Sequence, residues 1–174
     1  MRQLTAEARE VLEMCEVLVG YKTYVALIEP LIRPDQEVIC YGMGQEVERG
    51  RQALALARKG KKVVLISSGD SGVYGMAGLA YELARDRQMI EVIPGVSCVN
   101  AAATLLGAPL MQDFAVISLS DLLIPWEDIR KRLELAARAD FVLVLVNPRS
   151  QGRREQIIRA WNIVLQHRPA TTPV

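Results

Sequence analysis

Two glycine-bearing segments hold residues suited to binding a small molecule through the main chain. The first, S-S-G-D-S-G-V-Y-G at 67–75, has a glycine at every third position, and the second, I-P-G-V-S-C, covers 93–98. Glycine lets a ligand approach the backbone closely and adopts positive φ angles without strain. Asp70 adds a carboxylate that accepts hydrogen bonds from ribose hydroxyls or an amino group. The two segments together predict a nucleoside-sized binding site.

Both segments also admit a purely structural interpretation. Asp70 is suited to capping the N-terminus of a following helix, and Ser97 is suited to capping the next one. The first segment is not a Walker phosphate loop, because no Lys-Ser or Lys-Thr pair follows its glycines. The residues alone leave open whether Asp70 and Ser97 contact a ligand or cap helices.

A third glycine segment, Y-G-M-G-Q-E-V at 41–47, partly matches the glycine pattern of a dinucleotide-binding turn. It lacks the third glycine of that fingerprint, and the region 61–68 supplies no acidic residue for a ribose. A plain strand-to-helix turn is the simpler interpretation. An NAD(P)-binding domain built on Gly42 and Gly44 remains as an alternative.

Alternating strands and helices must position these loops. Apolar runs predict strands at 17–19, 37–41, 62–67, 90–93, 114–119 and 141–146. Helical periodicity predicts helices at about 5–15, 23–32, 45–58, 74–85, 96–106, 126–137 and 156–166. This alternation predicts an α/β chain with a mostly parallel sheet covered on both faces, in which ligands bind beyond the carboxyl ends of the strands.

The chain divides at a predicted hinge, Ala108-Pro109. We expect an N-terminal α/β domain over 1–108 and a partial C-terminal α/β domain over 109–174. The second part contains only two predicted strands, and two strands rarely form an independent sheet. The sequence therefore predicts that this C-terminal domain is incomplete, or that it depends on contacts with something outside it.

Composition excludes several classes of protein. The 174 residues are 51% hydrophobic but only 5% aromatic, so the core must be aliphatic. With 21 Lys and Arg against 20 Asp and Glu, the net charge of +1 argues against nucleic-acid or membrane-surface binding. The apolar runs are too short to cross a bilayer, and the first residues contain no signal-peptide pattern. We expect a soluble, cytoplasmic protein.

Cysteine and histidine are too sparse for a metal centre. Cys15, Cys40 and Cys98 are widely separated, and His167 is the single histidine. A zinc site needs three or four such ligands close together, so no metal is expected. A disulfide framework is equally unexpected in a cytoplasmic chain. Cys15 and Cys40 are predicted to be small buried core residues.

Several stretches together resemble the tetrapyrrole (uroporphyrinogen and precorrin) methyltransferases. The segment at 67–75 followed by I-P-G-V-S-C-V-N-A-A-A-T-L-L-G-A-P-L at 93–110 carries the resemblance. V-G-Y-K-T-Y at 19–24, D-F-A-V-I-S-L-S-D-L-L at 113–123 and V-N-P-R-S at 146–150 narrow it to the branch that acts on carbon 17 of a precorrin. The resemblance covers essentially the whole chain.

The resemblance implies a two-domain α/β enzyme that binds S-adenosyl-L-methionine in the cleft between its domains, usually as a homodimer. It implies methylation of precorrin-3B, or of its cobalt form, at carbon 17 with contraction of the ring. By motif, the cofactor contacts it implies are Ser68, Gly69, Asp70, Val73, Ser97, Cys98 and Asn147.

Basic residues near strand ends are candidates for binding the carboxylates of such a tetrapyrrole substrate. Arg149, Arg153 and Arg154 follow the last predicted strand, and guanidinium groups pair bidentately with carboxylates. Tyr21 and Lys22 lie at another strand end. The alternative interpretation of the arginines is a solvated helix face, and the residues alone favour it slightly.

Members of the resembled family open with a strand and a G-x-G-P-G-type loop before the helix that here begins near Thr5, and they continue beyond T-P-V with further strands. We therefore expect the first strand and the C-terminal strands to be missing from this fold. Two other interpretations stay open, a non-catalytic truncated fragment and a different methyltransferase of the same superfamily.

Overall fold

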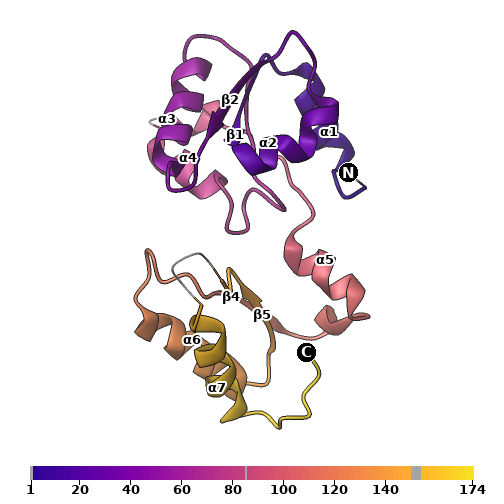
Figure 1. Ribbon diagram of the computed structural model, residues 1–174, viewed down its shortest axis with the longest axis vertical. Coiled ribbons are helices and arrows are strands. Elements are labelled where there is room, and N and C mark those ends of the chain that lie inside the picture. Colours follow the sequence, from indigo (N-terminus) through magenta and orange to yellow (C-terminus); the bar gives the residue numbers. More distant parts are fainter. Residues whose placement is uncertain (1, 85, 150–153) are drawn as a thin grey trace. The chain divides into compact units, whose positions relative to one another are not determined.

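The computed structural model describes residues 2–84, 86–149 and 154–174 (Figure 1). The chain forms two compact units, Met1–Asn100 and Ala101–Val174, called here the N-terminal and C-terminal units. The division falls within α5 (Cys98–Leu105). The described strands of each unit pair in parallel, which confirms the predicted α/β fold class.

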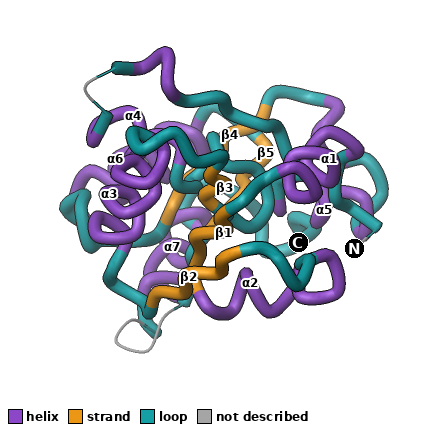
Figure 2. Tube along the Cα trace, turned by 90° about the horizontal axis from the view of Figure 1, so that it is seen from above, coloured by secondary structure: helices purple, strands orange, loops and turns teal. Residues whose placement is uncertain are grey.

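The N-terminal unit is built around a parallel sheet with the strand order β2-β1-β3 in its described residues (Figure 2). Its strands are β1 (Val17–Tyr21), β2 (Glu37–Tyr41) and β3 (Val63–Leu65). Its helices are α1 (Ala6–Met14), α2 (Lys22–Ile28), α3 (Glu46–Ala57) and α4 (Ala77–Leu83), with short 3₁₀ turns at Glu29–Leu31 and Arg87–Met89.

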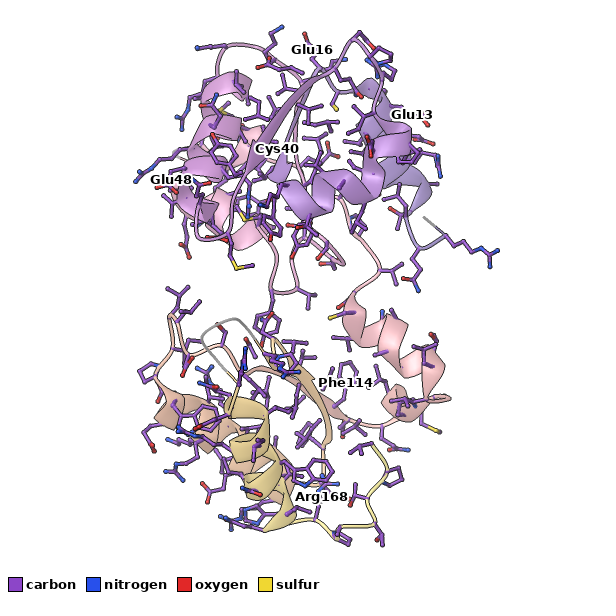
Figure 3. The ribbon with its side chains drawn as sticks, in the orientation of Figure 1. Glu13, Glu16, Cys40, Glu48, Phe114 and Arg168 are labelled. Atoms are coloured by element: carbon purple, nitrogen blue, oxygen red, sulfur yellow. The ribbon has the colours of Figure 1, made fainter. Side chains whose placement is uncertain are left out.

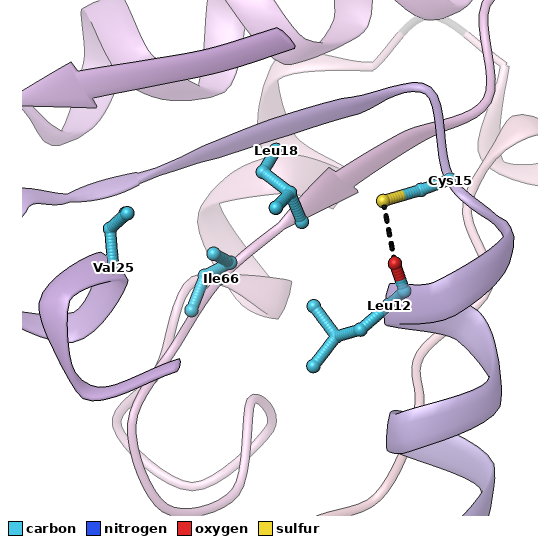
Figure 4. Close-up of a cluster of buried hydrophobic side chains, with 5 residues drawn as sticks. All are labelled: Leu12, Cys15, Leu18, Val25 and Ile66. Atoms are coloured by element: carbon cyan, nitrogen blue, oxygen red, sulfur yellow. Dashed lines mark hydrogen bonds between the residues drawn. The ribbon is translucent and has the colours of Figure 1, made fainter. Parts of the chain in front are cut away.

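The central strand β1 is buried on both faces. Val17 and Val19 pack on one face with Ala53 of α3, whereas Leu18 packs on the other face with Leu12 and its neighbours (Figure 4). Successive side chains of a strand point to opposite faces, so a strand covered on both sides must be apolar throughout. This explains the uninterrupted apolar run that marked the strand in the sequence.

Side-chain caps fix the ends of α1. The Thr5 hydroxyl accepts a hydrogen bond from the Ala8 N–H at 3.2 Å and so caps the N-terminus of the helix. At the other end, the buried Gln36 amide donates to the carbonyl oxygens of Leu12 (2.7 Å) and Cys15 (2.9 Å). Gln36 thereby supplies a donor to two carbonyl groups at the end of α1, where the helix itself offers no N–H partner, and the Leu12 carbonyl also accepts from the Cys15 thiol at 3.3 Å.

One predicted core cysteine is not in the core. Cys15 is 3% exposed, as expected, and burial raises the pKa of its thiol. Cys40, however, is exposed on β2 (Figure 3). The prediction for Cys40 is wrong because β2 lies at the edge of the described sheet, where one flank of the strand has no neighbour to cover it.

One predicted strand does not pair. Residues 90–93 form no strand with any described residue, although Ile90 has the extended angles φ −117° and ψ 124°. An extended segment becomes a strand only when a neighbouring edge lies within hydrogen-bonding distance, about 4.8 Å away. No described strand edge reaches residues 90–93 in this way.

The C-terminal unit has a smaller parallel pair of strands, β4 (Phe114–Ser118) and β5 (Val142–Val146). Its helices α6 (Trp126–Arg138) and α7 (Gln156–Leu165) pack with the strands around Leu119, Leu133 and Ala160, each fully buried. A 3₁₀ turn covers Pro109–Met111. The Arg168 guanidinium donates to the Ala137 and Phe141 carbonyls and so fastens the segment after α7 to the rest of this unit (Figure 3).

In the part of the chain that the structure describes, every helix is too short or too polar to cross a membrane.

Candidate functional site

The candidate ligand loops of the N-terminal unit lie at the carboxyl edge of its sheet. β1 and β2 run in register to Tyr21 and Tyr41, and β3 runs parallel beside them into the loop at 67–75. Tyr21 packs its ring edge-on against Tyr24, with centroids 5.1 Å apart, and the exposed Lys22 begins α2. Tyr21, Lys22 and the glycine loop thus share one edge, where open parallel sheets bind ligands.

Asp70 fastens the two glycine segments together. Its Oδ1 accepts hydrogen bonds from the N–H groups of Gly72 (2.8 Å) and Val73 (3.1 Å). Its Oδ2 accepts one from the N–H of Gly95 in the second segment, at 2.9 Å. The interpretation of Asp70 as a helix cap is wrong, because α4 begins only at Ala77 and Met76 occupies its cap position without a side-chain bond. The carboxylate instead closes a turn and joins two loops that are 25 residues apart.

These hydrogen bonds lower the pKa of the Asp70 carboxyl below its ordinary value. The N–H of Gly95 contributes most, desolvation opposes the shift, and the N–H groups of Gly72 and Val73 add to it. Donors that favour the charged form of a carboxyl group stabilise its carboxylate. Asp70 is therefore a carboxylate at neutral pH.

The two loops touch at glycines. A Cβ placed on Gly95 would collide with the carbonyl oxygen of Gly69, and Gly69 itself has φ +67°. Ser71 adds a second tie between the loops, because its hydroxyl donates to the Ile93 carbonyl at 3.2 Å. Thr5, at the start of α1, also donates to the Pro94 carbonyl, at 3.2 Å, and so ties that helix to the second segment. The second segment therefore requires Gly95 for space rather than for conformation.

The residues predicted to hold a cofactor in this unit gather around the contact between the loops. Ser68, Gly69 and Cys98 are exposed, and Val73 exposes 41% of its surface. Gly69 lies against the main chain of residues 96–98. Ser97 is buried, and its hydroxyl accepts a hydrogen bond from the N–H of Val99 at 3.3 Å, as expected of a residue that caps α5.

The third glycine segment is a closed turn. The N–H of Gly42 donates to the side-chain oxygen of Gln45 at 2.7 Å, and the N–H of Gly44 donates to the Glu46 carboxylate at 3.3 Å. A dinucleotide site needs such N–H groups for its pyrophosphate. Their engagement by side chains favours the plain turn over an NAD(P) site.

The C-terminal unit holds the remaining predicted residues. Asn147 follows β5 with φ +52°, and its amide donates to the Ser118 hydroxyl at the end of β4, at 3.1 Å. Asparagine tolerates such left-handed angles better than most residues. Arg149 and Arg154 are exposed, and Arg153 lies outside the described residues.

Sequence reasoning missed the residues that build the site without facing a ligand. Gly95 and Ser71 each bond across the loops, and Thr5 bonds to the second loop from the start of α1. The Ser67 hydroxyl accepts the N–H of Met76 at 2.9 Å. Pro-Gly after a predicted extended segment was the available signal for Gly95. Among the described residues no group of three or more His, Cys, Asp or Glu is placed to hold a metal ion.

The family model of the tetrapyrrole (corrin/porphyrin) methylases matches residues 1–174. The chain is 49% identical to the cobalt-factor III methyltransferase of Priestia megaterium, over 98% of this chain and 33% of that protein. It is also 49% identical to the probable cobalt-factor III C(17)-methyltransferase of Salmonella typhimurium, over 98% of this chain and 72% of that protein.

The fold matches a solved structure as well. The crystal structure of the methyltransferase CobJ superposes with a TM-score of 0.88 at 38% identity, over 96% of this chain and 71% of that chain. The chain thus spans about a third of the Priestia relative and about seven tenths of the other two. By sequence and by fold, the chain belongs to the tetrapyrrole (corrin/porphyrin) methylases.

Proposed function

We propose that this chain carries the S-adenosyl-L-methionine-dependent methylation of carbon 17 of precorrin-3B, or of its cobalt form, with contraction of the ring. The names of the relatives at 49% identity support this substrate class. We propose further that the protein acts in the cytoplasm as a homodimer. The observation that carries the proposal is the pair of glycine loops that Asp70 joins at the carboxyl edge of the sheet.

The residues at these loops fit the proposed cofactor. S-adenosyl-L-methionine supplies an electrophilic methyl group on a sulfonium, and loss of that methyl leaves a neutral thioether. The chain's task is therefore to hold donor and acceptor carbon in line, and no metal ligand is required. The exposed Gly69 admits close approach to the main chain, Ser68 offers a hydroxyl, and the exposed part of Val73 offers an apolar surface.

Asp70 acts in this proposal mainly by positioning. A carboxylate has about four acceptor sites, and backbone N–H groups occupy three of them. One site on Oδ2 remains for a ribose hydroxyl or an amino group. The proposed cofactor-binding set is Ser68, Gly69, Asp70, Val73, Ser97 and Cys98 in the N-terminal unit and Asn147 in the C-terminal unit.

Basic side chains are proposed to bind the acetate and propionate groups of the tetrapyrrole. Arg149 and Arg154 are exposed and make no ion pair with any described residue. Guanidinium groups without a partner are available for bidentate contacts with carboxylates. Arg153, Tyr21 and Lys22 complete the proposed substrate-binding set.

Reversing two of these charges should weaken substrate binding selectively. We expect the double variant Arg149→Glu, Arg154→Glu to raise the Kd for cobalt-factor III by about tenfold, because two exposed ion pairs become repulsions. Its affinity for S-adenosylhomocysteine should stay unchanged. The matched control is Lys131→Glu, Arg132→Glu on the exposed face of α6, which makes the same change in net charge. Equal weakening in both double variants would remove these arginines from the substrate site.

Calorimetric titration of the chain with S-adenosylhomocysteine tests the proposed function. We expect saturable binding at one site, and no binding of NADH in a parallel titration. A folded chain that binds neither compound would support the non-catalytic interpretation instead. Binding of NADH would replace the methyltransferase proposal with a nicotinamide site at Gly42 and Gly44.

A further inference from the structure

Arg49 of α3 is a buried arginine whose charge has no partner among the described residues. The residue is 4% exposed. Its Nη2 donates to the Sδ of Met76 at 3.1 Å, whereas Nε and Nη1 have no hydrogen-bond partner in the described part of the chain. It also makes no ion pair with any described residue. A guanidinium keeps its charge in proteins and a thioether is only a weak acceptor, so no described group compensates this charge.

Arg168 shows how this chain compensates a guanidinium with a structural role. Its side chain is 16% exposed, and it pairs with the carboxylate of Asp140. It also donates to two main-chain carbonyls of its own unit. Removing an ion from water without such partners is strongly unfavourable, and an apolar side chain of similar volume would fill the same space at lower free energy. Packing therefore does not explain the charge of Arg49, and the charge points to an anionic ligand.

Arg49 lies beside the base of the glycine loop at 67–75. α3 begins shortly after the carboxyl end of β2, so its first turn, which ends at Arg49, lies at the carboxyl edge of the sheet, where ligands bind. Met76, the partner of Nη2, directly follows the loop, and its N–H donates to the Ser67 hydroxyl at 2.9 Å. This bond joins the two ends of the loop. Arg49 therefore reaches from α3 to the closed base of the segment proposed to hold the cofactor.

Close packing of α3 on α4 holds Arg49 in this place (Figure 1). A Cβ on the neighbouring Gly50 would lie 2.7 Å from Cδ1 of Leu83 and 4.0 Å from Cε of Met76, so only a glycine lets the two helices approach this closely. Met76 also lines an apolar cavity of about 270 Å³ beside β3, but Arg49 does not line it. The uncompensated charge is thus a feature of the contact between α3 and α4 and does not belong to that cavity.

We propose that Arg49 is a carboxylate-binding residue at the base of the glycine loop, where it pairs with a carboxylate of a ligand bound to that loop. The inference rests on the proposed function, whose two ligands both carry this group: the cofactor at its aminoacyl end, and the tetrapyrrole on its acetate and propionate groups. The guanidinium fork matches the geometry of a carboxylate. Met76 is unbranched and has three rotatable bonds, so its thioether can turn aside and give its place to the stronger, charged acceptor.

The test compares wild type with Arg49→Met, which removes the charge and keeps an unbranched side chain. If the cofactor supplies the carboxylate, the Kd for S-adenosylhomocysteine in calorimetric titrations should rise about 30-fold. The Kd for its decarboxylated analogue, which keeps the adenosine, the thioether and the amino group, should be the same in both proteins. If the tetrapyrrole supplies it, the Kd for cobalt-factor III should rise by a similar factor and the Kd for S-adenosylhomocysteine should not. The titration that shows the loss identifies the source of the carboxylate.

Stability of the ligand-free chain separates ligand binding from a structural role. Arg49→Met should raise the unfolding temperature by about 2–4 °C, because an apolar side chain replaces a buried ion that has no described partner. A structural role predicts a fall instead. The matched control is Arg51→Met, which makes the same change in charge at an exposed position of the same helix and should leave every affinity unchanged.

An NMR readout on wild type keeps the test independent of how the variant folds. The Nε–H resonance of Arg49, assigned by its loss in Arg49→Lys, should move when S-adenosylhomocysteine or cobalt-factor III is added. The proposal is overturned if this resonance stays in place while both ligands bind. It is also overturned if Arg49→Met weakens the binding of S-adenosylhomocysteine and of its decarboxylated analogue equally, because Arg49 would then act only on the shape of the loop. A wild-type chain that binds neither ligand would overturn the proposed function itself, and this inference with it.

Discussion

Replacing Asp70 by asparagine is expected to weaken the binding of S-adenosylhomocysteine by roughly 30-fold, equivalent to about 2 kcal/mol. The amide oxygen of asparagine can still accept from the N–H groups of Gly72 and Val73. Its NH₂ group would then face the N–H of Gly95, so that donor meets donor and the tie between the loops is lost. Calorimetric titration of the variant measures the loss.

The matched control for this prediction is Asp113→Asn. Asp113 is an exposed aspartate whose carboxylate makes no hydrogen bond with any described residue, so the same loss of charge should leave the affinity unchanged. Equal affinity of wild type and Asp70→Asn would show that the loops hold their positions without the carboxylate. Asp70 would then have no part in the cofactor site.

The pH dependence of stability gives Asp70 a second, independent signature. Its pKa is lowered in the folded state, so its contribution to stability is present above the unfolded value of about 3.9. That contribution is lost as the pH falls through the lowered pKa of the folded state. The difference in unfolding free energy between wild type and Asp70→Asn should therefore shrink below about pH 4. A difference that stays constant down to pH 2 would contradict this account.

Replacing Gly95 by alanine is expected to have an even larger effect, a loss of roughly 100-fold in affinity for S-adenosylhomocysteine. The new Cβ would collide with the Gly69 carbonyl and would lie 3.3 Å from the Cα of Asp70. All of these are backbone atoms that cannot rotate away, so the loops must separate and the bond from Gly95 to Asp70 must lengthen. Calorimetry measures the affinity, and thermal unfolding measures the accompanying loss of stability.

Gly78→Ala supplies the matched control. Gly78 lies within α4, and a Cβ at this position would meet nothing within 4 Å. Alanine is favoured over glycine in helices, so this variant should be as stable as wild type or more stable by up to about 1 kcal/mol. Wild-type affinity in Gly95→Ala would mean that the collision is relieved without moving the loops.

The sequence by itself determined most of the secondary structure and the family. β2 occupies Glu37–Tyr41 as predicted, and the apolar run at Val17 begins a strand that is buried on both faces. The glycine spacing at 67–75 and the motif at 93–98 located the candidate site. These features can be recognised from the sequence because apolar periodicity and turn residues determine structure over a few neighbouring positions.

Only the tertiary structure decided which distant groups meet. The sequence predicted that Asp70 either contacts a ligand or caps a helix. In the fold its carboxylate accepts a hydrogen bond from Gly95, 25 residues away, and so joins the two loops. The sequence also predicted that Cys40 is buried in the core and that residues 90–93 form a strand. In the described sheet, Cys40 is exposed on the edge strand β2 and residues 90–93 are unpaired. In each case the environment of the residue depends on which other segment of the backbone lies next to it. The order of the strands and the contacts between loops decide this, and both involve residues that are far apart in the sequence.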